Sequence, residues 1–130
     1  MKSYLLFFLL TINVACNRDK CHNRITFINN SNKDLYYSAG ENYPDTNIVD
    51  DNPIVDESYK INHHSTGNFT KRSCYEQVFN LTSKKIYFIF DAHVLQTTPW
   101  DTVMKKYMIV KRYELTLQGL KDSNWTITYP

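Results

Sequence analysis

Alternating hydrophobic and polar positions run through most of this chain, and a period of two residues predicts β-strands. The run 86–90 contains five apolar residues without a polar break, which is typical of a central strand covered on both faces. The predicted strands lie at 24–28, 33–38, 86–90, 107–117 and 125–129, and the segment 58–62 could form another. An Asn-Asn-Ser-Asn turn at 29–32 predicts a hairpin between the first two of them.

The same alternation predicts which side chains point into a core. Ile25 and Phe27 share one face of the first strand, and Trp125, Ile127 and Tyr129 alternate with threonines in the last. The residues expected to share the buried face of the strand at 107–117 are Tyr107, Ile109, Tyr113, Leu115 and Leu117. These strands would therefore pack around one apolar layer.

Helical signals are few. Thr98 can cap a short helix that begins at Pro99 and continues to about Lys105, and a turn or short helix is expected at 118–124. The segment 69–81 is ambiguous between a strand and a short helical turn. The pattern predicts a mainly β fold, an antiparallel β-sandwich with one or two short helices, and an immunoglobulin-like sandwich is one form of it.

The N-terminal segment has the order of a secretory signal. Lys2 is followed by an uncharged apolar run at 4–12 and by Val14-Ala15-Cys16, with Asn13 three residues before the cysteine. The apolar run is too short to span a bilayer, which takes about 20 residues. It resembles the lipobox of bacterial lipoproteins, in which the cysteine becomes the lipidated N-terminus. We expect a signal peptide at 1–15, a lipidated tether at 16–23 and a single β-rich domain at 24–130.

Charge and cysteine number narrow the class of protein. The chain carries 15 Lys and Arg against 13 Asp and Glu, and loss of Lys2 leaves a net charge of about +1, which does not predict a nucleic-acid partner. No cofactor motif is present in the sequence. If Cys16 carries lipid, Cys21 and Cys74 remain as an even pair in a compartment where disulfides persist, so we expect them to pair.

The C-terminal third carries a family resemblance. It contains Pro99-Trp100-Asp101, Lys111-Arg112-Tyr113-Glu114-Leu115 and the ending Asn124-Trp125-Thr126-Ile127-Thr128-Tyr129-Pro130. Together with the Ile-x-Phe-x-Asn stretch at 25–29, these resemble small uncharacterised lipoproteins of Bacteroidetes. The resemblance implies a lipid-anchored protein of the bacterial cell envelope, at the outer membrane, and it brings no catalytic residues with it.

No enzyme motif is visible, but one metal site is conceivable. Asp91 and His93 are two residues apart and would share a face of a strand, with His63 or His64 as a third ligand of a small metal-dependent hydrolase. The sequence contains no HExxH motif and no Gly-x-Ser-x-Gly elbow. We therefore expect no enzymatic activity and assign no metal ligand.

The aromatic residues suggest a further alternative. Aromatic residues make up 15% of the chain, and an exposed Trp or Tyr platform, with Trp100 and Trp125 as candidates, would suit a saccharide-binding module. Asp101-Thr102-Val103 resembles the O-glycosylation motif of exported Bacteroidetes proteins, which makes Thr102 a candidate acceptor. The leading expectation is a binding or scaffolding module whose partner is an envelope protein or a saccharide. The N-terminal lipid would hold this module at the membrane.

Overall fold

The computed structural model describes residues 21–40, 47–48 and 51–130. The signal segment, Cys16 and the first part of the tether lie outside these residues. The described elements include four α-helices: α1 (Tyr75–Leu81), α2 (Ala92–Thr97), α3 (Trp100–Lys105) and α4 (Leu117–Asp122). Two 3₁₀ helices, η1 (Pro53–Val55) and η2 (Glu57–Tyr59), precede β3.

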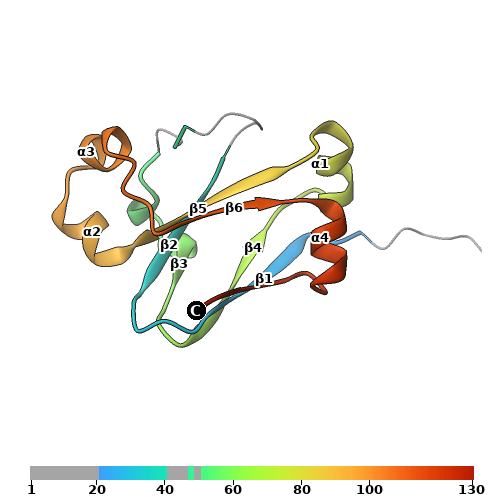
Figure 1. The fold of residues 1–130 in the computed structure, drawn as a ribbon, viewed down its shortest axis with the longest axis horizontal. Helices are drawn as coiled ribbons and strands as arrows, with labels where there is room; N and C mark the ends of the chain where they lie inside the picture. Colours follow the sequence, from blue (N-terminus) through green and yellow to red (C-terminus); the bar gives the residue numbers. More distant parts are fainter. Residues whose placement is uncertain (1–20, 41–46, 49–50) are drawn as a thin grey trace, which may run out of the picture.

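The described strands form two sheets, so the fold is mainly β (Figure 1). The first sheet has the order β4-β1-β7, with β4 (Ser65–Thr70), β1 (Arg24–Asn29) and β7 (Thr126–Tyr129). The second has the order β3-β2-β5-β6, with β3 (Lys60–Ile61), β2 (Leu35–Ala39), β5 (Lys85–Asp91) and β6 (Lys111–Leu115). Every strand pair is antiparallel except β1 with β7, which is parallel.

The two sheets pack face to face around one apolar core, which confirms the predicted sandwich. Ile25 and Phe27 of β1 are fully buried there, and Trp125 and Ile127 join them from the last strand region, as the alternation predicted. The second sheet contributes Leu35, Tyr37, Ile61, Tyr87 and Ile89. The strand orders differ from the ABED and CFG sheets of an immunoglobulin constant domain, so the connectivity is not that of an immunoglobulin.

A second core lies on the outer face of the second sheet. β5 is buried along its whole length, which confirms that the run 86–90 is a central strand covered on both faces. Phe88 and Phe90 point outward into this second core and meet Leu95 of α2 and Val103 of α3. The helices α2 and α3 lie at one end of the molecule, whereas α1 and α4 lie at the other (Figure 1).

The predicted hairpin between the first two strands is wrong. β1 and β2 belong to different sheets, and the chain crosses between them at Asn29, whose side chain is fully buried. The Asn29 amide donates to the carbonyl oxygens of Lys33 and Asn62 at 2.8 and 3.0 Å, while its Oδ1 accepts from Ser31. These bonds tie the turn after β1 to the end of β3, so the residues that look like a hairpin turn form a crossover instead.

Two further expectations fail for local reasons. His93 is not on a strand, because Asp91 ends β5 and its carboxylate accepts from the His93 N–H, which caps α2, an α-helix that the pattern did not predict. Tyr107 has a φ of 51°, so the alternation at 107–117 is interrupted before β6 begins. Tyr107 therefore packs against Phe88 on the outer face, whereas Tyr113 packs in the sandwich core.

Candidate functional site

The N-terminal end of the described chain is fixed to the domain at three points. Cys21 and Cys74 form a disulfide, which is the pairing expected from their number. The next residue, His22, stacks on the Trp125 ring with centroids 4.1 Å apart, and its backbone N–H donates to Glu76 at 3.0 Å. The tether thus joins the domain beside the start of α1.

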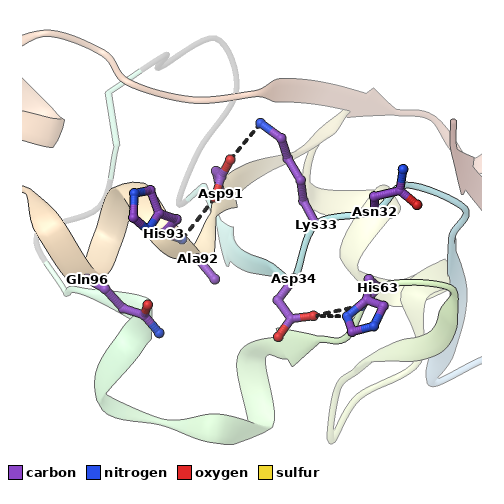
Figure 2. A pocket seen from close by; sticks show the side chains of 8 residues that line it. All are labelled: Asn32, Lys33, Asp34, His63, Asp91, Ala92, His93 and Gln96. Atoms are coloured by element: carbon purple, nitrogen blue, oxygen red, sulfur yellow. Dashed lines mark hydrogen bonds and ion pairs between the residues drawn. The ribbon is translucent and has the colours of Figure 1, made fainter.

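A pocket of about 440 Å³ collects the residues of the conceivable metal site (Figure 2). Asp91 and His93 approach it from the junction of β5 and α2, and His63 approaches from the turn between β3 and β4. Figure 2 shows His93 and His63 on opposite sides of this pocket, with the carboxylates of Asp34 and Asp91 between them. We call it the histidine pocket; its lining residues are Asn32, Lys33, Asp34, His63, Asp91, Ala92, His93 and Gln96.

Both carboxylates of the histidine pocket already have partners. Asp91 accepts from the Lys33 ammonium at 2.8 Å and from the His93 N–H at 2.9 Å. Burial alone would raise the pKa of Asp91, but these bonds outweigh it and hold that pKa below its usual value. The backbone N–H and the ring of His63 likewise lower the pKa of Asp34.

The arrangement in this pocket is that of paired charges. Within the residues that the structure describes, no group of three or more His, Cys, Asp or Glu side chains could hold a metal ion. His64, the other candidate ligand, does not line the pocket and forms a hydrogen bond of 2.7 Å with the Asn32 side chain. Asp91 here acts as a helix cap and an ion-pair partner.

A larger pocket, of about 640 Å³, lies between β2, the two 3₁₀ helices and α3. Tyr37, Tyr59 and Trp100 supply its aromatic surface, so we call it the aromatic pocket. Tyr59 meets Tyr37 edge to face at 5.3 Å and is 40% exposed, while Trp100 is half-buried and packs edge-on against Phe90. The other lining residues are Ser38, Ala39, Asp51, Asn52, Pro53, Val55 and Asp56.

Polar groups border these rings. Asn52 and Asp56 each use one side-chain oxygen to cap a 3₁₀ helix, accepting from the N–H groups of Ile54 and Ser58. Among the described residues, the Asn52 amide nitrogen and the Asp51 carboxylate have no hydrogen-bond partner, whereas the Asp56 carboxylate also interacts with the Ser58 side chain. The pocket thus combines aromatic faces with free donors and acceptors, a combination that orients small ligands.

The remaining predicted site residues are placed as follows. Trp125 is 8% exposed and belongs to the core, so it cannot serve as a surface platform. Thr102 lies on α3 and is half-buried, and its O-glycosylation stays a prediction. In the described part of the chain, no helix is long and apolar enough to cross a membrane. Cys16 lies outside the described residues.

Comparisons with known proteins identify no relative: no family model, no curated protein and no solved structure matches this chain. The class that the fold defines is a small β-sandwich with helices at both ends. The sequence pattern pointed to the residues of the histidine pocket and to Trp100. It did not reveal Tyr59, because nothing in the polar segment 51–59 indicates that two 3₁₀ helices bring this ring into one pocket with Trp100.

Proposed function

We propose that this chain is a lipid-anchored binding domain of the bacterial cell envelope, held at the outer membrane through Cys16. The signal-like order of residues 1–16 supports the anchor, and the paired cysteines suit an oxidising compartment. Cys16→Ser should release the protein from membranes or leave it unprocessed. Recovery of this variant in the membrane fraction at the normal processed mass would contradict the anchor.

The aromatic pocket is the binding site in this proposal, and a saccharide is the ligand class that it fits best. The observation that carries this assignment is that the partly exposed ring of Tyr59 and the half-buried ring of Trp100 line one pocket together with Asp51, Asn52 and Asp56. Sugar C–H groups pack on aromatic faces, while hydroxyl groups donate to carboxylates and amide oxygens. The volume of about 640 Å³ lies within the range of small-ligand sites.

The test is a titration of the mature protein with soluble oligosaccharides released from bacterial envelope polysaccharides and from host glycans, followed by NMR. Tyr59→Ala should weaken binding about tenfold, because removal of one stacked ring costs on the order of 1 kcal/mol. Tyr107→Ala is a matched control, since Tyr107 is 41% exposed and lies outside the pocket. Equal loss in both variants, or shifts confined to other residues, would contradict the assignment.

For the histidine pocket we propose a structural role rather than hydrolysis. A metal-dependent hydrolase needs carboxylate and imidazole groups that converge on one ion and leave a coordination position for water. Asp91 is instead committed to Lys33 and to the cap of α2, and His93 and His63 lie on opposite sides of the pocket. An Asp91→Asn variant should therefore alter the cap of α2. It should not reduce any hydrolytic activity, because we expect the wild-type protein to have none.

A further inference from the structure

We propose that the end of the domain formed by α1 and α4 lies against the headgroup layer of the membrane that carries the lipid anchor. This inference rests on the proposed lipidation of Cys16 and adds an orientation to it. The surface is made by exposed residues of α1, α4, the segment before α1 and the start of β1, together with the half-buried Lys71. We call this surface the basal face; the residues used to define it are Arg24, Lys71, Arg72, Leu81 and Lys121.

The length of the tether limits how far this end can lie from the membrane. Only five peptide steps separate Cys16 from Cys21, and a fully extended chain spans at most about 3.6 Å per residue, or roughly 18 Å in all. Cys21 cannot move away from the domain, because it is bonded to Cys74, the residue that caps α1. His22 is held against Trp125 and Glu76, so the tether cannot lengthen by peeling off the next residue.

The chemistry of the basal face suits a lipid headgroup layer. Leu81, the last residue of α1, is 91% exposed, which is the highest exposed fraction among the exposed large hydrophobic residues that the structure describes. Within the described ranges, the four basic residues of this face form no ion pair with an acidic side chain: Arg24, Lys71, Arg72 and Lys121. An apolar tip among unpaired cations is the composition of surfaces that bind anionic bilayers.

The acidic residues nearby do not cancel this charge through direct pairing. Glu76 is bonded to His22, and the Asp122 carboxylate accepts from Gln118 at 2.7 Å. At the end formed by α2 and α3, Lys33 is paired with Asp91 and His63 with Asp34. Two exposed lysines at the end of α3, Lys105 and Lys106, form no ion pair with a described acidic residue. What distinguishes the basal face is its position, because its unpaired cations lie at the end of the domain that the tether keeps near the membrane.

This orientation also places the candidate ligand site. The aromatic pocket is bounded by α3, which lies at the opposite end of the molecule from α1 and α4 (Figure 1). With the basal face on the membrane, the Tyr59 ring is held away from the lipid and open to soluble ligands. A domain tethered at its other end would bring the same pocket toward the headgroups.

The test uses the full lipidated protein in vesicles of phosphatidylethanolamine and phosphatidylglycerol that contain a brominated lipid, a contact quencher of tryptophan. Leu81→Trp places a reporter on the basal face. Val55→Trp is the matched control, because Val55 is 83% exposed and lines the aromatic pocket. The signal of wild-type protein, which contains Trp100 and Trp125, is subtracted in both cases.

We expect quenching of the added emission to be at least twofold greater for Leu81→Trp than for Val55→Trp. Replacing Arg72 and Lys121 by Gln in the Leu81→Trp protein should reduce that difference. Equal quenching at the two positions, in protein that floats with the vesicles, would overturn the orientation and leave the anchor intact. Failure of the wild-type protein to float with the vesicles would overturn the anchor itself, and the orientation with it.

Discussion

Replacing Asn29 by Ala should destabilise the domain by about 3 kcal/mol, because one buried amide organises the crossover between the two sheets. Its Nδ2 atom donates to the carbonyl oxygens of Lys33 and Asn62 at 2.8 and 3.0 Å, and its Oδ1 accepts from the Ser31 N–H at 3.0 Å. A buried polar group left without its partner costs about 1 to 3 kcal/mol, and solvent can reach part of this turn. The same side chain also reaches the Ile61 carbonyl oxygen and the Ser31 hydroxyl, and loss of all these bonds gives about 3 kcal/mol, or a thermal midpoint lower by roughly 10 to 20 °C.

Asn29→Asp separates the donor role of this side chain from its size. The carboxylate keeps the acceptor for Ser31 but turns a second oxygen toward the Lys33 and Asn62 carbonyls. Burial beside carbonyl oxygens raises the folded pKa of such an Asp above its unfolded value of about 3.9. Protonation of this Asp therefore stabilises the folded state. That contribution to stability is fully present below the unfolded pKa and is lost as the pH rises through the folded pKa. Relative to wild type, the variant should be more stable at pH 4 than at pH 7.

The assay is thermal unfolding followed by circular dichroism at both pH values. Asn30→Asp is the control, because Asn30 is exposed next to Asn29 and its replacement adds the same charge outside the buried crossover. A midpoint for Asn29→Asp at pH 7 that equals that of Asn30→Asp would refute the role given to the buried amide.

The other predictions concern the core, the disulfide and the histidine pocket. Trp125→Ala should cost about 3 to 5 kcal/mol in unfolding free energy, because the ring is buried in the sandwich core; an unchanged thermal midpoint would remove Trp125 from that core. Intact-mass analysis of the mature protein should find that Cys21 and Cys74 are alkylated only after reduction; two alkylated thiols before reduction would exclude the bridge. Reduction should lower the free energy of unfolding by about 4 kcal/mol on the loop-entropy model for a separation of 53 residues. A carboxyl NMR titration should give Asp91 a pKa below 3.8, so the stability it contributes is present above the unfolded pKa and is lost as the pH falls through the folded one; a raised value would contradict the Lys33 pair.

Burial could be predicted from the sequence at positions where it follows directly from the alternation, or the unbroken run, of apolar residues along a strand. Ile25 and Phe27 alternate with polar residues and are fully buried, and the unbroken apolar run at 86–90 is covered on both faces. In these strands the side-chain pattern and the tertiary environment agree, because both are inner strands of a sheet and the pattern matches the faces that are covered, one for β1 and both for β5.

The failures fall where a single polar side chain or one backbone angle decides the path of the chain. Asn29 looks like a turn residue, and only its bonds to β3 residues distant in sequence show that it directs a crossover. Asp91 looks like the end of a strand, and its role as a helix cap depends on the chain bending at Ala92. Such choices depend on partners brought together by the fold, which a local pattern cannot contain.

The candidate sites divide in the same way. The sequence singled out Asp91, His93 and His63, and the fold does bring them to one pocket, but with partners that the spacing could not reveal. The aromatic pocket was only partly visible, through Trp100, because Tyr59 reaches it by way of two short 3₁₀ helices in a polar segment. Residues that come together from different layers of the fold have no characteristic separation in the sequence, so a local pattern does not predict that they meet.

The parallel pairing of β1 with β7 sets the order in which this domain can mature. Thr26 lies opposite Thr126, about one hundred residues later, so the inner strand of the first sheet has no partner on that side until β7 is delivered. Loop closure over such a distance must occur before the contact can stabilise anything, which favours slow folding. A ribosome or translocation channel that releases the chain from its N-terminus therefore leaves one side of β1 as an open edge until β7 emerges, so this sheet is completed only after all the other strands have been delivered.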